Sequence, residues 1–194
     1  MELASYIQHI RIHLIRTHVR VLDWFEVSDA LKAYRPADGG WTVAEILEHI
    51  ALTSHFLLIL IDKGTGKALR NVRELSLDRL LAETVFDPAR INAIGVHKSF
   101  DWIRPEHMEP TGTKSELTVK AELTDQLQQC LTYLDRLHAG EGLLYTTTMT
   151  VNGLGRLNVY EYIYFLSKHA ERHLQQMEEN RTEFLEFSRA HESN

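Results

Sequence analysis

Apolar residues recur at three- and four-residue steps along most of this chain, and that period constrains the fold more than any other feature. Such stripes are typical of amphipathic helices that bury one face. The pattern predicts long helices from residue 2 to the high twenties and over 42–64, 116–138 and 158–187. With 4 prolines and 10 glycines in 194 residues, little interrupts them. We therefore expect an all-α fold, a four-helix bundle.

Side chains at the predicted helix ends support these boundaries. Thr42 and Glu45 have the spacing of a capping box, in which each side chain bonds the backbone N–H of the other residue. Asn158 and Glu161 have the same spacing at the start of the last helix. Gly64 is a typical residue to end the second helix.

The segments between the long helices carry weaker signals. A short helix is expected within 76–86, and no period is visible over 92–114, so the second and third long helices are joined by a long irregular connection. Threonine-rich residues before Asn152-Gly153 predict a short hairpin or extended crossing. We expect one domain over 1–187 and a frayed tail over 188–194.

Charge and composition narrow the possible partners. The net charge is −6, which gives no general attraction to nucleic acid or anionic lipid. The longest apolar run, Phe56 to Ile61, is far shorter than the roughly 20 residues of a membrane span. The N-terminus lacks the basic and apolar regions of a secretory signal. We expect a cytoplasmic protein that binds neither nucleic acid nor membrane.

Histidine is unusually frequent, with 11 residues, and two histidines fall on one helical stripe. His169 and His173 are four residues apart, so they lie on one helix face about one turn apart. The neighbouring apolar residue Leu166 lies on the same face. Burying two imidazoles is costly unless they find partners, and a shared metal ion is one such partner.

A third ligand is expected from another helix that faces the same interior. His49 lies on the inward stripe of the second helix, whereas His55 lies on the outer face. Three histidines and no further ligand describe an open site, which is the catalytic rather than the structural pattern. Gln176, one turn beyond His173, is a candidate to hydrogen-bond a ligand imidazole. Tyr162 is a second such candidate, although a buried tyrosine with a satisfied hydroxyl is the more common case.

The other histidines favour plainer interpretations. His9 and His13 are also four residues apart but lie roughly 90° to 130° from their stripe, at the edge of the bundle or in solvent. His18 lies closer to its stripe. His97 and His107 fall in the irregular segment, where surface positions are the commoner outcome. His138 and His191 fall at a helix end and in the tail.

Several other side chains receive expectations from their positions. Cys130 lies within an apolar stripe and is expected to be an inert buried thiol. Trp41 is expected to pack at the start of the second helix, and Trp102 to cap the bundle or line a pocket. Glu171 and Arg172 are expected to point away from the site, and Glu45 and Glu48 to be capping or solvated groups. Lys98, Arg104 and Arg156 are candidates for a cationic or polar rim around the site.

Two segments together resemble a known family. Residues 40–50 (GWTVAEILEHI) and 169–177 (HAERHLQQM) are similar to the DinB/YfiT-like superfamily, with its tryptophan-led E-x-x-H helix and its H-x-x-R-H-x-x-Q last helix. The resemblance implies an up-down-down-up four-helix bundle, often a homodimer. It also implies a divalent metal ion, zinc or nickel, held here by His49, His169 and His173.

The resemblance leaves two classes of function open. Some members transfer or use low-molecular-weight thiols, and others are described as metal-dependent hydrolases. The first hypothesis is therefore a metal-dependent enzyme that acts on a small-molecule substrate with a thiol cosubstrate or with water. The alternative is a non-enzymatic stress-response protein that binds a metal or small ligand. A third, plainer reading is a helical dimer whose histidines are only core residues.

Overall fold

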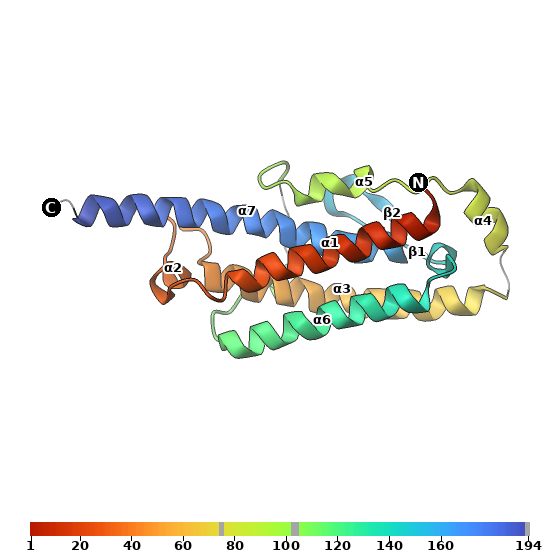
Figure 1. Cartoon of the computed structure of the whole chain (residues 1–194), viewed down its shortest axis with the longest axis horizontal. Helices are drawn as coiled ribbons and strands as arrows, with labels where there is room; N and C mark the ends of the chain where they lie inside the picture. The colour runs from red at the N-terminus through yellow and green to blue at the C-terminus, as the bar shows by residue number, and fades with distance from the viewer. Residues whose placement is uncertain (74–75, 102–104, 193–194) are drawn as a thin grey trace.

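The structure is a computed structural model that describes residues 1–73, 76–101 and 105–192. Long helices make up most of it. The longest are α1 (Leu3–Asp23), α3 (Val43–Asn71), α6 (Glu116–Arg136) and α7 (Val159–Glu192). These four helices run alongside one another, with α1 and α7 in one direction and α3 and α6 in the other (Figure 1). α1 and α3 each pack against both α6 and α7. The prediction of an all-α fold is confirmed.

Short elements occupy the connections. α2 follows α1, and the connection between α3 and α6 contains α4, α5 and two short 3-10 turns. Two further 3-10 turns flank the first strand of a hairpin. The bounds are α2 (Asp29–Ala33), α4 (Leu77–Glu83), α5 (Ala89–Asn92), η1 (Ala93–Gly95), η2 (Glu106–Met108), η3 (Glu141–Leu144) and η4 (Val151–Gly153).

Both predicted capping boxes are present. Thr42 Oγ1 accepts a hydrogen bond from the Glu45 N–H at 3.2 Å, and the Thr42 N–H donates to Glu45 Oε2 at 2.8 Å. Asn158 Oδ1 accepts from the Glu161 N–H at 3.1 Å, and Glu161 Oε2 accepts from the Asn158 N–H at 2.8 Å. Each box satisfies two N–H groups that the first helical turn leaves open, which fixes where α3 and α7 begin.

The end of α3 differs from the prediction. The helix does not stop at Gly64 but continues to Asn71. A Cβ atom at Gly64 would lie 3.3 Å from side-chain atoms of both Tyr145 and Val159. The glycine therefore serves the close approach of α3 to the chain entering α7, and not helix termination.

A two-stranded hairpin precedes α7, as the threonine-rich stretch predicted. β1 (Thr146–Met149) pairs antiparallel with β2 (Gly155–Asn158). The turn between them includes Asn152 and Gly153, which have φ angles of 48° and 63°. Asparagine and glycine tolerate this left-handed conformation better than other residues, so they allow the chain to reverse here.

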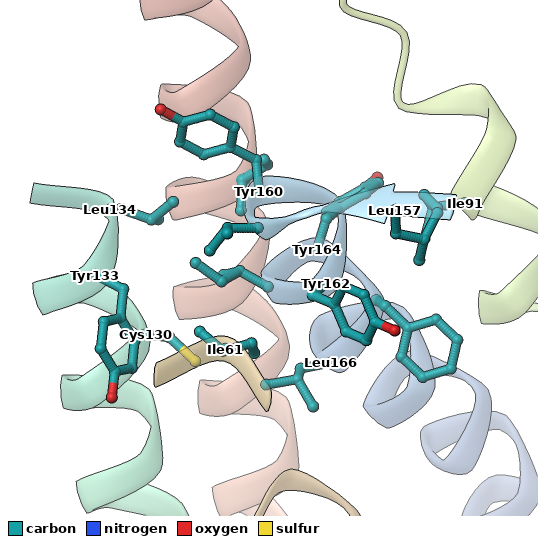
Figure 2. Close-up of a cluster of buried hydrophobic side chains, with 14 of the residues drawn as sticks. Ile61, Ile91, Cys130, Tyr133, Leu134, Leu157, Tyr160, Tyr162, Tyr164 and Leu166 are labelled. Carbon is teal, nitrogen blue, oxygen red and sulfur yellow. The ribbon is translucent and has the colours of Figure 1, made fainter. Parts of the chain in front are cut away.

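The core consists of two apolar clusters separated by a polar layer. One cluster contains Leu57 of α3 with Phe165 and Leu166 of α7, and Figure 2 shows part of it. The second contains Ile50 of α3 and Leu174 of α7. Between the clusters, α3 and α7 bury the polar residues Thr53, Ser54, Ser167 and His169. This polar layer lies where the candidate site forms.

Cys130 of α6 belongs to the first cluster, next to Ile61 and Leu134 (Figure 2). Burial raises the pKa of its thiol to about 12. The nucleophilic thiolate is therefore scarce at neutral pH. Its placement agrees with the expected buried, inert thiol.

α3 is long and apolar enough, by length and composition, to cross a membrane. More than half of its most apolar stretch is buried against the rest of the chain. Burial of this extent is typical of a core helix, which passes the same test of length and composition.

Gly142→Ala is expected to destabilise the fold. A Cβ there would lie 2.6 Å from Cε2 of the buried Tyr160 ring, whose hydroxyl accepts a hydrogen bond from the Gly142 N–H at 3.2 Å. Overpacking of this kind costs about 1–3 kcal/mol of unfolding free energy. Gly66→Ala is the control, because its Cβ would meet only the end of the Arg70 side chain at 3.6 Å. That helical substitution should raise stability by up to about 1 kcal/mol. Urea unfolding measures both, and equal midpoints would contradict the expectation.

Candidate metal centre

Three buried histidines from two helices converge in the polar layer. His49 comes from α3, and His169 and His173 come from α7; none is more than 7% exposed. One nitrogen of each ring lies within 4.8 Å of those of the other two rings. The structure thus brings together the three residues that sequence spacing selected.

Helix geometry and helix packing place these rings. The four-residue spacing on α7 puts Nε2 of His169 and Nε2 of His173 3.1 Å apart, with ring centroids at 4.5 Å. The His49 ring reaches across from α3, with its centroid 5.2 Å and 4.8 Å from those of His169 and His173. The capping box at Thr42 fixes the start of α3 seven residues before His49. It therefore helps set which way the His49 side chain faces.

Hydrogen bonds outside the cluster orient two of the rings. Nδ1 of His49 donates to the Met108 carbonyl oxygen at 2.6 Å, since a carbonyl can only accept. Nδ1 of His173 contacts Gln176 Oε1 at 2.8 Å and donates to it. In a neutral imidazole the other nitrogen then carries the lone pair, so both Nε2 atoms present lone pairs to the cluster. This arrangement is typical of metal-binding histidines and their supporting partners.

Burial keeps the imidazoles of His169 and His173 neutral. It lowers the pKa of His169 well below the usual histidine value, and the neighbouring His173 and His49 rings lower it further. Burial also lowers the pKa of His173 strongly, with His49 adding to the effect and the Gln176 hydrogen bond opposing it. Neutral imidazole is the form that binds metal.

The donor set fits a divalent transition metal. Two imidazole nitrogens on a tetrahedral ion with Zn–N bonds of about 2.0–2.1 Å are separated by about 3.4 Å. The 3.1 Å between the two α7 nitrogens is close to that separation. Within the described residues, no carboxylate or thiol joins the group. Three neutral nitrogen ligands would leave a coordination position open, which is the arrangement of catalytic sites.

Aromatic rings pack against the cluster. The Trp41 ring lies 4.6 Å from the His49 ring, centroid to centroid. Phe165 is nearly parallel to His169, at 6.3 Å and 9°. The sequence analysis expected Trp41 to pack only at the start of the second helix, but its ring also limits how far His49 can turn.

Two hollows meet at the histidines. The first, which we call the polar hollow, has a volume of about 350 Å³ and is lined by all three histidines together with His97, Lys98, Phe100, Asp101, Arg172 and Gln176. The second, the apolar hollow, has a volume of about 250 Å³ and lies toward the hairpin. His49 and His169 line both hollows, so the candidate site is reached from two chemically different sides.

Arg172 corrects a prediction. Its position in the sequence predicts a side chain that points away from the site, but Arg172 is buried and lines the polar hollow. Its guanidinium donates to the Val96 carbonyl oxygen at 2.5 Å and lies 5.1 Å from the Phe100 ring centroid. By helical rotation it lies about 60° from His169, a signal that the sequence analysis passed over. Glu171, on the other side of α7, pairs with Lys168 at 2.7 Å.

Of the two described candidates for a polar rim, one lies at the site and the other does not. Lys98 lines the polar hollow and pairs with Glu179 at 2.7 Å. Arg156 lies on β2, where it bonds Thr146, and it lines neither hollow. Arg104 and Trp102 lie outside the described residues.

His97 also lines the polar hollow, although a surface position was considered the commoner outcome. Its Nδ1 is buried and has no hydrogen-bond partner among the described residues. Tyr162 does not bond a histidine. It lines the apolar hollow, and its hydroxyl donates to the Thr148 carbonyl oxygen at 3.1 Å.

The remaining histidines lie away from the cluster. His9 contacts the Tyr164 hydroxyl at 3.2 Å and His13 contacts Ser167 Oγ at 3.0 Å, both half-buried at the α1–α7 edge. His18 lines a separate small cavity. Exposed positions are occupied by His55, His107, His138 and His191.

Glu48 corrects a second prediction. It was expected to be a capping or solvated group, but it is 3% exposed. Its carboxylate accepts hydrogen bonds from the Thr111 N–H at 3.1 Å, the Thr111 hydroxyl at 2.9 Å and the Gly112 N–H at 2.8 Å. With the His49–Met108 bond, this carboxylate ties the segment before α6 to α3 beside the site.

Glu48→Ala is expected to release that segment. Three donors lose their acceptor, which should lower the unfolding free energy by about 1–3 kcal/mol. Trypsin should then cleave faster after Lys114, as followed by mass spectrometry. Glu48→Gln is the control, because its amide oxygen still accepts and its loss should be smaller. An unchanged cleavage rate and urea midpoint in Glu48→Ala would show that Glu48 does not hold the segment before α6 against α3.

Comparison with known proteins identifies the family. The family model described as DinB superfamily matches residues 13–177. That range includes His49, His169 and His173. Of the long helices, it leaves out only the start of α1 and the end of α7. Comparisons with curated proteins and with solved structures found no match. The chain belongs to the DinB superfamily.

Proposed function

We propose that the protein is a metal-dependent enzyme whose three histidines hold one divalent cation, zinc or nickel. One observation carries this proposal: three buried imidazoles meet where two hollows join. A purely structural ion would need a closed ligand set, whereas this donor set leaves room for an exogenous ligand. Imidazole nitrogen suits both metals.

The proposed reaction transfers a low-molecular-weight thiol to a small electrophilic substrate, or hydrolyses a small substrate with water. A divalent cation would supply Lewis acidity and lower the pKa of a bound thiol or water toward neutrality. The chain's own groups would bind and orient the reactants. Gln176 and the Met108 carbonyl hold the ligand rings, so the open side of the cluster stays directed at the hollows.

The polar hollow is the proposed entrance for the thiol cosubstrate. Lys98 and Arg172 give it cationic groups, and the unsatisfied Nδ1 of His97 offers a further polar contact. Small thiols of the cell commonly carry carboxylates, which such groups attract. Asp101 and Glu179 moderate this charge, so we expect selection for a zwitterionic rather than a strongly anionic ligand.

The proposal also covers the helix arrangement, the oligomeric state and the cellular location. The opposed directions of the long helices support the up-down-down-up four-helix bundle implied by the family. We also propose a cytoplasmic homodimer that acts on a small molecule and not on nucleic acid. The resemblance supports the homodimer, and the net charge of −6 supports the exclusion of nucleic acid.

Elemental analysis of untagged protein, purified without added metal, tests the site. We expect about one divalent metal per chain, as in other three-histidine sites. The double variant His49→Ala/His169→Ala should hold none, and His55→Ala, an exposed histidine on the same helix, should keep the wild-type content. Absence of metal after reconstitution with zinc and with nickel would refute the proposal.

Turnover separates the two classes of function. The metal-loaded protein is assayed with cysteine or glutathione and an aryl halide, and separately with an aryl ester and water. Thiol-dependent loss of the halide, or ester hydrolysis, absent in the double variant, supports the enzyme. Stoichiometric metal with no turnover across thiols and esters would favour the non-enzymatic metal-binding alternative.

Gln176→Leu is expected to weaken metal binding and leave the fold intact. The substitution removes the acceptor that holds the His173 ring, and the loss of such partners lowers metal affinity by about 10- to 100-fold. Competition with a chromogenic chelator measures it. Gln128→Leu, on the exposed face of α6, is the matched control. Equal affinity in both variants would show that the Gln176 contact does not support the site.

A further inference from the structure

The apolar hollow is lined by a different set of groups from the polar one. Its walls come from α3, α7, the hairpin with its turn and the connection before α6, and include Leu57, Phe165, Met149 and Met108. Within the described part of the chain, no aspartate, glutamate, lysine or arginine lines it. A charged ligand group placed there would lose its hydration without gaining a countercharge.

Two of the polar groups around this hollow are already engaged. The Tyr162 hydroxyl donates to the Thr148 carbonyl oxygen at 3.1 Å, and the Met108 carbonyl oxygen accepts from His49 Nδ1 at 2.6 Å. The Thr53 hydroxyl lies 3.5 Å from His49 Nε2. The hollow therefore offers an occupant mainly dispersion contacts and desolvation, except at the end where His49 and His169 lie.

Its size sets a limit on the occupant. A dry cavity of about 150 Å³ lined by aliphatic and aromatic side chains is large enough to bind benzene. The apolar hollow, at about 250 Å³, has room for one aromatic ring with a short substituent. Leu60 at its mouth is 42% exposed, so apolar surface remains there for an occupant to cover.

We propose that the apolar hollow binds a compact uncharged group, a single aromatic ring or a branched alkyl chain of similar size, as the apolar part of the substrate. The occupant's reactive end would lie toward His49 and His169, the two residues that line both hollows. This assignment of a substrate class rests on the proposed function. Binding of the apolar group itself does not.

Methionine methyl groups provide a local readout of occupancy. The chain has four methionines, of which Met108 and Met149 line the apolar hollow. Met177 is buried in the other apolar cluster, and Met1 is exposed at the N-terminus. In protein labelled with ¹³C at the methionine methyls, toluene should shift the Met108 and Met149 signals saturably and leave the other two unchanged. Met108→Leu and Met149→Leu assign the signals.

Two further measurements vary the charge of the ligand and the shape of the hollow. On protein treated with EDTA, so that no metal attracts a carboxylate, benzoate should bind at least about tenfold more weakly than toluene. Thr150→Trp places a large ring at the exposed mouth and should weaken toluene binding by at least about tenfold. Thr148→Trp is a second blocking variant, and Thr124→Trp, on the exposed face of α6, should bind toluene like wild type.

The outcomes distinguish this inference from the proposed function, because metal content is measured on the same samples. Toluene shifts that are absent, equal at all four methionines or unaffected by both blocking variants would overturn the inference, whatever the metal content. Saturable, blocked binding in protein that takes up no metal would support the apolar site while refuting the metal-dependent reaction. With metal bound as well, aryl or branched-alkyl electrophiles become the substrates to assay.

Discussion

Burial of three imidazoles between two apolar clusters is the constraint on which the rest of the structure depends. A charged imidazole is disfavoured there by burial, and the cationic Arg172 nearby lowers the pKa of His169 further. Neutral rings must still be held in one tautomer and one orientation. The Met108 carbonyl and Gln176 do this for His49 and His173. The first contact comes from the connection before α6, and the second comes from α7 itself.

The irregular connection is therefore part of the site and not merely a linker. Glu48 bonds the backbone at Thr111 and Gly112, and that anchor keeps the Met108 carbonyl beside His49. An earlier part of the same connection supplies Lys98 to the polar hollow. On the opposite side, the hairpin completes the apolar hollow. The connection thus contributes to both hollows, through Lys98 and Asp101 on the polar side and through Met108 on the apolar side.

Features with a local cause could be predicted from the sequence. The apolar period gave the long helices, capping boxes gave the starts of α3 and α7, and helical rotation put His49, His169 and His173 on inward faces. Features whose cause is distant in sequence could not. Glu48 looked solvated because its partners lie 63 and 64 residues away in a segment without period. Gly64 looked like a helix end because the close approach of Tyr145 and Val159 is visible only in three dimensions.

The separation of the histidines along the chain has a consequence for folding. His169 and His173 are neighbours on one helix, but His49 lies about 120 residues earlier, and closing so long a loop costs the unfolded chain considerable entropy. A cation shared by the three rings would act as a removable cross-link between the first and last parts of the chain. Its release would remove that link between α3 and α7. Supply of the ion would then control the persistence of the native state as well as its chemistry.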